Sequence, residues 1–298
     1  MNDYQNHPLA GADDLDSAMS KLWAFYKKYF AGMYIISVVM ALLSGIITSR
    51  FEMSSLYSGY SVDPQQLLEM MKGMVVPYSL LLIVTFVSGV LLHAWILERP
   101  LGQENTILKV LKGSLIALIP VLIVFIVFCI AGAMLTTIGL VLLVLPGLFA
   151  VLYISTVAIF ALPVTLIETR NPGLIISRSF SLAHNKFWPN IAWVIVLALI
   201  IIVIAIVIGG LTMLPFSGTF MKALADPGDA TAMLEMAKNP VYIGLSSLAT
   251  ALVTPVFPIL AFILYFSNNA ENPAEVITPE DDNKVKVEDL YPRMPDNQ

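Results

Sequence analysis

Charged residues are scarce in this chain of 298 residues, and that scarcity excludes an ordinary soluble protein. Asp, Glu, Lys and Arg together make up 12% of the sequence, whereas apolar residues make up 58%. A soluble domain carries about 25% charged and about 45–50% apolar residues. Five stretches contain no charged residue at all, and they are 30–49, 73–97, 113–167, 187–221 and 240–270.

Cysteine and histidine are almost absent, which excludes several kinds of site. The single cysteine, Cys129, cannot form an intrachain disulfide. The three histidines are His7, His93 and His184, and no His or Cys cluster has the spacing of metal ligands. Phosphate-binding loops, dinucleotide fingerprints and hydrolase elbows are missing, and no basic stripe indicates nucleic-acid binding. The sequence therefore predicts no cofactor, metal or nucleic-acid partner.

The charge-free stretches predict six transmembrane helices. A helix needs about 20 apolar residues to cross the ~30 Å hydrocarbon core. The stretch 113–167 is too long for one helix and must fold back once. The expected spans are 29–49, 75–97, 113–135, 138–167, 190–214 and 241–266. The turn between spans three and four falls either near Thr136-Thr137 and Gly139 or at Pro146-Gly147, with 139–145 as a short re-entrant piece.

The basic residues predict the orientation of the chain. The N-terminal segment, the loops after spans two and four, and the C-terminal segment together hold 12 of the 16 Lys and Arg residues. Because Lys and Arg accumulate on the cytoplasmic side of membrane proteins, both termini are expected there. The polar, acidic start does not have the basic and apolar parts of a cleavable signal peptide, so the first span is expected to serve as the targeting signal.

A threefold pattern is visible along the chain. Short amphipathic segments precede the odd-numbered spans, and they are 14–30, 105–112 and 172–188. Asp13 or Asp14 can cap the first segment, and Asn171 followed by Pro172 can cap the third. Each even-numbered span ends in a glutamate followed closely by a proline. The pattern predicts an all-α membrane protein of three repeated helical hairpins with cytoplasmic interfacial helices.

One region resembles a known bacterial family over about 45 residues. Its marks are Pro146-Gly147, Tyr153, Pro163, Glu168, Ser177-Arg178-Ser179 and Asn185-Lys186-Phe187-Trp188. This pattern resembles uncharacterised six-helix proteins related to the membrane domain of glycerophosphoryl diester phosphodiesterases. The catalytic barrel of the full-length relatives has no counterpart here, because the longest polar segment has only about 30 residues. The resemblance therefore implies the membrane part without the enzyme, in a bacterial inner membrane.

Two sets of residues are candidate sites. Proline-broken helices and nearby polar groups can line a cavity or hinge at mid-membrane, and the candidates are Tyr153, Thr156, Pro163, Thr254, Pro255 and Pro258. The same residues can equally form simple kinks. Basic and aromatic side chains of the amphipathic segments can bind lipid headgroups or only anchor the hairpins, and these candidates are Lys27, Lys28, Arg178, Lys186 and Trp188.

Two further features are most simply explained by packing. His93 is an ionisable side chain within a span, about one turn from Glu98-Arg99 near the cytoplasmic interface, and without a deeper partner acid it is expected to serve packing or the interface. Ser37, Ala41 and Gly45 stand four residues apart, which permits close helix contact within the molecule or with another subunit. Internal packing is the expectation, and the oligomeric state is not predicted.

These observations predict that the chain has three parts, and they leave two hypotheses for its function. The expected parts are a cytoplasmic amphipathic segment (1–28), a six-span membrane domain (29–267) and a disordered acidic cytoplasmic tail (268–298). The first hypothesis is a non-enzymatic protein that organises the bacterial envelope or helps to assemble it, in contact with lipid and with a membrane-protein partner. The second is a transporter or lipid-translocating protein with a polar midplane cavity. No acid–base pair supports an intramembrane enzyme.

Overall fold

The protein is a multi-pass, all-α membrane protein, as predicted. The computed structural model describes residues 4, 6–12, 14–50, 64–102, 106–225, 231–271 and 273. Within these residues every regular element is a helix, and six helical stretches are long and apolar enough to cross a membrane. Those stretches are Leu15–Arg50, Lys72–Leu101, Ile107–Leu142, Val144–Ile167, Phe187–Lys222 and Pro240–Glu271.

The helices follow one another with short connections. In chain order, the α-helices are α1 (Leu15–Arg50), α3 (Pro64–Glu98), α4 (Thr106–Leu142), α5 (Val144–Ala158), α6 (Ala161–Ile167), α7 (Pro172–Asn185), α8 (Phe187–Met213), α9 (Ser217–Ala225), α10 (Thr231–Lys238), α11 (Pro240–Val253) and α12 (Val256–Glu271). Two 3-10 turns, η2 (Arg99–Leu101) and η3 (Leu214–Phe216), follow α3 and α8. Extensive contacts join α1 to α3, α4 to α5 and α8 to α11, and equally extensive contacts join α1 to α11 and α3 to α4.

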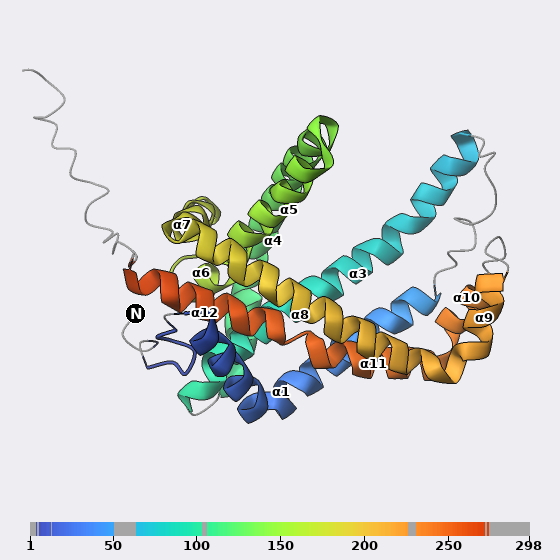
Figure 1. The fold of residues 1–298 in the computed structure, drawn as a ribbon, viewed down its shortest axis with the longest axis horizontal. Helices are drawn as coiled ribbons and strands as arrows, with labels where there is room; N and C mark the ends of the chain where they lie inside the picture. Colours follow the sequence, from blue (N-terminus) through green and yellow to red (C-terminus); the bar gives the residue numbers. More distant parts are fainter. Residues whose placement is uncertain are drawn as a thin grey trace, which may run out of the picture.

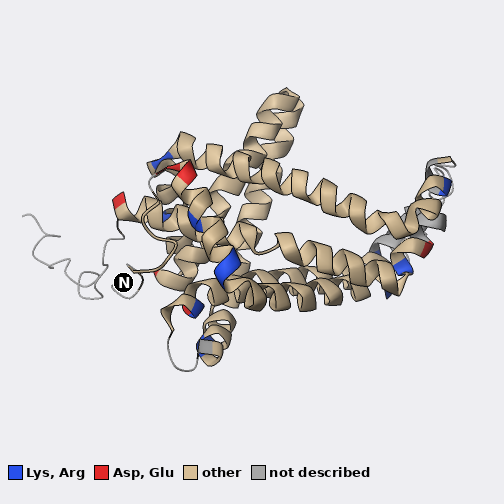
Figure 2. Ribbon diagram, turned by 60° about the horizontal axis from the view of Figure 1, so that its bottom comes forward, with Lys and Arg blue, Asp and Glu red and all other residues tan. Residues whose placement is uncertain are grey.

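The helices diverge from a common packed end (Figure 1). We call this end the base; it holds the N-terminal segment 4–12, the first half of α1, η2, α6, α7 and the second half of α12. From the base, α4 and α5 project together as one arm, α3 projects as another, and α1, α8 and α11 run together as a third. Charged residues gather at the base and at the far end near α9 and α10, with an uncharged stretch between them (Figure 2).

Capping residues begin the helices where the sequence predicts. Asp14 accepts a hydrogen bond from the Ser17 backbone N–H at 2.8 Å, and Asn171 accepts from the N–H groups of Gly173 and Leu174. Such side-chain acceptors satisfy amides that have no partner in the first helical turn. The predicted caps Asp14 and Asn171 are therefore confirmed, whereas Asp13 lies outside the described residues.

The amphipathic segments differ from the prediction of three separate interfacial helices. The first continues directly into span one, with a kink at Tyr29 (φ −111°, ψ 17°). The second is simply the first turns of the unbroken α4, which starts at Thr106. Only α7 is a separate helix, because the backbone leaves the helical region at Lys186 (φ −125°, ψ 61°) before α8 begins.

Prolines break two of the spans at equivalent places. Proline has no N–H to donate and its ring crowds the carbonyl four residues earlier. Accordingly, the helix is interrupted at Ile159 ahead of Pro163, between α5 and α6, and at Thr254 ahead of Pro258, between α11 and α12. The half-helices that follow, α6 and α12, both pack into the base. Pro120, in contrast, lies inside the continuous α4.

The turn between spans three and four lies at Leu143, so neither predicted position is correct. α4 continues to Leu142, Leu143 is extended (φ −167°, ψ 160°), and α5 begins at once. The two helices can meet this closely because Gly139 faces Gly147: a Cβ on Gly139 would lie 2.7 Å from the Gly147 Cα. The sequence predicted breaks at glycine and proline, but here the glycines serve helix contact instead.

Small residues of α1 pack inside the molecule, as expected. Ser37 is buried, and a Cβ on Gly45 would meet the Ile243 side chain of α11 at 2.7 Å. Gly32, on the same helix, lies against the indole of Trp95 in α3. The absence of side chains at these points lets α1 approach both neighbours closely.

The C-terminal boundary falls later than the sequence suggested. α12 continues to Glu271, and Asn268, placed at the start of the tail, is 1% exposed. Residues 272 and 274–298, which hold most of the predicted acidic tail, lie outside the described residues.

His7 ties the N-terminal segment to the base. Its Nδ1 accepts from the Leu9 N–H at 3.3 Å, so Nε2–H donates to the Ile96 carbonyl at 3.2 Å. The ring stacks on Phe266 at 5.2 Å. Burial disfavours the charged imidazolium, and it lowers the pKa of His7 from 6.5 to about 4 although the bond to Ile96 opposes the shift.

We expect His7 to make the fold sensitive to acid. The unfolded chain takes up a proton near pH 6.5 and the folded chain only near pH 4, so stability is lost as the pH falls through this window. The loss approaches about 3 kcal/mol at its lower end. Unfolding measured from pH 7 to pH 4 should show a smaller decline for His7→Gln than for the wild type. Equal declines would contradict this assignment.

Candidate functional site

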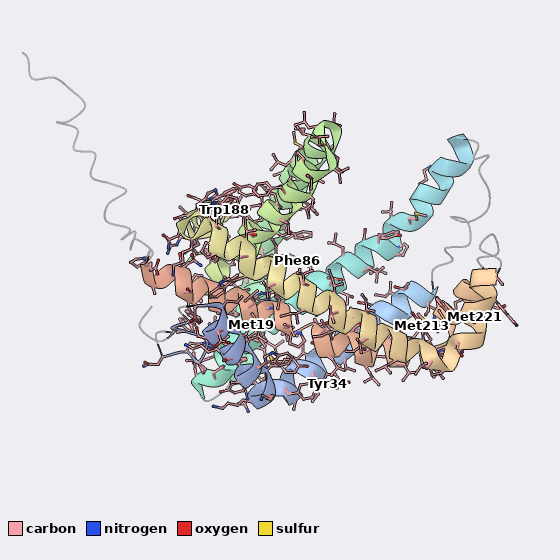
Figure 3. All side chains as sticks on the ribbon, viewed as in Figure 1. Met19, Tyr34, Phe86, Trp188, Met213 and Met221 are labelled. Atoms are coloured by element: carbon pink, nitrogen blue, oxygen red, sulfur yellow. The ribbon has the colours of Figure 1, made fainter. Side chains whose placement is uncertain are left out.

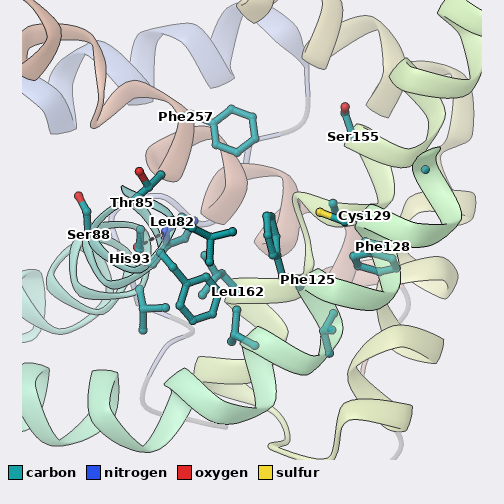
Figure 4. A pocket seen from close by; sticks show the side chains of 18 of the residues that line it. Leu82, Thr85, Ser88, His93, Phe125, Phe128, Cys129, Ser155, Leu162 and Phe257 are labelled. Carbon is teal, nitrogen blue, oxygen red and sulfur yellow. Dashed lines mark hydrogen bonds between the residues drawn. The ribbon is translucent and has the colours of Figure 1, made fainter. Parts of the chain in front are cut away.

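A large apolar cavity lies between the diverging arms. Its volume is about 930 Å³, and it is partly open. α3, α4 and α5 supply most of its walls, and the α11–α12 junction closes one side through Thr254, Phe257 and Pro258 (Figure 4). Phe125 and Phe128 project from α4 and Leu82 from α3. The volume is at the upper end of the range of about 300–1,000 Å³ that is usual for ligand pockets.

A few polar groups interrupt the apolar lining. They come from Tyr78, Thr85, Ser88, His93, Cys129, Thr136, Ser155 and Thr254, and no residue of the lining is Asp, Glu, Lys or Arg. His93 donates Nδ1–H to the Gly89 carbonyl at 2.7 Å, which leaves Nε2 as an acceptor. The arrangement suits an uncharged, largely apolar ligand, because burial of an unpaired charge here would be costly.

The structure brings together only part of the predicted cavity set. Thr254 and Pro258 line the cavity, as does Ser155. Pro255 and Pro163 are buried at the two helix breaks. Thr156 is 1% exposed, and its hydroxyl donates to the Leu152 carbonyl at 2.8 Å.

Tyr153 belongs to a different cluster, an aromatic group at the base. Its hydroxyl lies 3.4 Å from His184 Nε2, and its ring lies near Phe180 and Phe187. His184 in turn stacks on Phe187 at 5.5 Å. The contacts of Tyr153 therefore join α5 to α7 and to the start of α8.

Most of the α3 residues that line the cavity were not predicted from the sequence. Tyr78, Thr85, Ser88 and His93 recur at roughly helical spacing and share the cavity face. Polar residues on one face of an otherwise apolar span were a signal that could have identified it. The signal was weak because Thr and Ser are common in transmembrane helices, where they bond to their own backbone.

The predicted headgroup residues have separate environments. Lys27 and Lys28 are exposed on α1, and the Lys28 ammonium lies 5.3 Å from the Tyr29 ring centroid. Trp188 is 69% exposed at the base end of α8, far along that helix from Met213 (Figure 3). Lys186 forms an ion pair with Glu271 at 2.5 Å.

Arg178 instead belongs to a buried polar network. Its Nε donates to both carboxylate oxygens of Glu168, at 3.0 and 3.3 Å, and its Nη2 donates to Asn269 at 2.7 Å. The Tyr265 hydroxyl donates to the same carboxylate at 2.7 Å. The network therefore ties the end of α6 to α7 and α12.

A reciprocal amide pair lies next to this network. Asn190 and Asn268 exchange hydrogen bonds of 3.3 and 2.9 Å, and Asn190 also donates to the Leu182 and Ala183 carbonyls. Both amides are almost fully buried. They join the start of α8 to α7 and α12 and, with the Glu168 network, hold the base in one arrangement.

The chain was compared with known proteins, and no protein-family model, curated protein or solved structure matches it. The resemblance to the membrane domain of glycerophosphoryl diester phosphodiesterases stays a prediction. Among the residues that the structure describes, no group of three or more His, Cys, Asp or Glu is placed to hold a metal ion.

Proposed function

We propose that this protein is a non-enzymatic membrane protein that holds a lipid acyl chain in the cavity between α3 and the α4–α5 hairpin, and thereby helps to organise its membrane. The observation that carries the proposal is the cavity itself, which is large, partly open and almost entirely apolar. An acyl chain matches such a lining because it has no polar group to leave unpaired.

The charge distribution supports an orientation with the base on the cytoplasmic side, and the family resemblance favours a bacterial inner membrane. The N-terminal segment, the loops after spans two and four and the C-terminal segment, all expected on the cytoplasmic side, carry 12 of the 16 basic residues. In that orientation the cavity lies within the hydrocarbon core, where lipid chains reach it between the diverging arms. A membrane-protein partner is compatible with this role, and the α4–α5 arm, with Val141 80% exposed, is the surface that such a partner or lipid would cover.

Lipid translocation is a second candidate, favoured by the helix break beside the cavity. Thr254 and Pro258 line the cavity, and the helix is interrupted between Val253 and Val256. Transporters build substrate sites from such discontinuous helices. A lipid-flux assay in vesicles separates the candidates, because a protein that only holds lipid moves none across the bilayer.

We expect that filling the cavity removes the bound lipid. Ala133 and Ser155 line it from α4 and α5, so Ala133→Phe with Ser155→Phe places two rings in the space of an acyl chain. The amount of a photoreactive-chain phospholipid crosslinked to the purified protein should fall on the order of tenfold, which corresponds to ~1.4 kcal/mol.

Ala205→Phe is the matched control, because it adds the same ring to an exposed position of α8 outside the cavity lining. This variant should crosslink as the wild type does. Undiminished crosslinking of the double variant, with its thermal stability retained, would contradict lipid binding in the cavity.

A further inference from the structure

The polar side chains of α3 give the apolar cavity one wall that can form hydrogen bonds. Thr85, Ser88 and His93 all line the cavity from this helix (Figure 4). Ser88 is 8% exposed and His93 is 4% exposed, so both are buried within the molecule. Polar groups are thus held at the edge of a space whose lining is mostly apolar.

The Ser88 hydroxyl has no hydrogen-bond partner among the described residues. Ser and Thr in transmembrane helices usually bond to the carbonyl four residues earlier, as Ser114 does to the Val110 carbonyl at 2.7 Å. Ser37 and Ser179 are also buried without a partner, but neither of them lines the cavity. The Ser88 hydroxyl is therefore left for a ligand in the cavity.

His93 offers an acceptor on the same wall. Its Nδ1–H donates to the Gly89 carbonyl at 2.7 Å, so Nε2 of the neutral ring carries a lone pair. Within the part of the chain that the structure describes, no group donates to Nε2. The ring also packs on Phe262 of α12, with 5.7 Å between the centroids. A bare acyl chain would leave the acceptor unpaired, which is unfavourable for a buried polar atom.

We propose that the ligand of the cavity is an uncharged lipid with a hydroxyl group, and that this hydroxyl donates to Nε2 of His93. This assignment rests on the proposed function, because the chain of the same lipid fills the apolar part of the cavity. An ionised carboxylate or phosphate is disfavoured at this place, since no Lys or Arg lines the cavity to compensate its charge. A hydroxyl supplies the missing donor without any charge.

His93 lies at the base end of the α3 lining, which suits the polar end of a lipid. It precedes Glu98 and Arg99, the charged residues at the base end of this helix, by little more than one turn. From His93 the lining follows α3 back to Tyr78, about 22 Å of helix. A lipid with its hydroxyl at His93 has this length for its chain, and Ser88 on the way can donate to an ester oxygen.

The test compares two photoreactive probes in nanodiscs of phosphatidylcholine. One is hexadecanol with a diazirine in its chain, and the other is its methyl ether, which has no O–H to donate. The readout is the ratio of alcohol to ether crosslinked to the full-length protein, divided by their ratio in the bilayer. The wild type should favour the alcohol on the order of tenfold, the effect of one buried hydrogen bond.

Equal capture of the two probes by the wild type would overturn the proposal and assign Nε2 to water. This comparison needs no variant, so it holds even where a substitution at His93 disturbs the fold.

His93→Asn tests the acceptor itself. Asparagine removes Nε2 but keeps an amide that can donate to the carbonyl four residues earlier, as Asn268 does to Leu264 at 2.8 Å. The variant should lose the preference for the alcohol while it captures the ether as the wild type does. A retained preference would contradict the role of His93.

His184→Asn is the matched control. His184 makes the same kind of bond, from Nδ1 to the Phe180 carbonyl at 2.8 Å, but it is exposed and lies outside the cavity lining. The control should keep the preference for the alcohol. An equal loss in both variants would show that recognition of the hydroxyl does not occur at His93.

The filled-cavity variant separates this proposal from the proposed function. Ala133→Phe with Ser155→Phe should lower the capture of both probes. If it lowers neither, the cavity is not the lipid site, and the proposed function fails together with the hydroxyl assignment. If it lowers both while the wild type captures the two probes equally, the lipid site stands and only the hydroxyl assignment fails.

Discussion

Replacing Arg178 with methionine should lower the free energy of unfolding by about 3–5 kcal/mol, the cost typical of breaking a buried ion pair from one side. The Arg178 and Glu168 side chains are 13% and 7% exposed. Without the guanidinium, the Glu168 carboxylate keeps the Tyr265 hydroxyl as a donor but loses its compensating charge. Chemical or thermal unfolding in one detergent, followed by tryptophan fluorescence, measures the loss.

Two variants test whether burial is the cause. Glu168→Gln with Arg178→Met removes both charges and should recover a large part of the stability, because the unpaired charge, rather than the missing pair, carries the cost. Lys186→Met breaks the ion pair between Lys186 and Glu271. Their side chains are 27% and 56% exposed, respectively. Such exposed pairs contribute only about 0–1 kcal/mol. A loss in Arg178→Met no greater than in Lys186→Met would show that the Glu168 network is not a buried one.

A single methyl group on Gly139 should destabilise the α4–α5 hairpin by about 1–3 kcal/mol, the usual cost of overpacking. The added Cβ of Gly139→Ala would lie 2.7 Å from both the Cα and the N of Gly147 and 2.9 Å from the Pro146 carbonyl carbon. All three are backbone atoms, so no side chain can rotate away and the helices must separate. The melting temperature should fall.

Gly209→Ala is the matched control, and we expect it not to lower the stability. Gly209 lies inside α8, and a Cβ there meets no atom within 4 Å. In a helix interior, alanine is favoured over glycine by roughly 0.5–1 kcal/mol, so this variant should be neutral or slightly more stable. If both variants raise the melting temperature by similar amounts, Gly139 and Gly147 are not in close contact.

The six spans and several helix starts could be predicted from the sequence because they depend on local chemistry. Apolar length against bilayer thickness is a property of each segment alone, and the caps at Asp14 and Asn171 act on amides two or three residues away. The missing N–H of Pro163 and Pro258 marked both as places where a helix can break or kink, but it did not decide between the two, since Pro120 lies inside the continuous α4. The predictions of the spans and of the caps needed no knowledge of neighbouring helices.

The cavity and the role of Arg178 depend on residues that are distant in the sequence. From its own helix, Arg178 was predicted to bind lipid headgroups, yet it donates to Glu168 and Asn269 from two other elements. Tyr265 donates to the same Glu168 carboxylate. The hairpin turn at Leu143 likewise depends on Gly139 meeting Gly147. Composition determines which segments enter a bilayer. Contacts between helices determine which helix faces meet and where a cavity remains. The periodicity of an almost uniformly apolar span carries little information about those contacts.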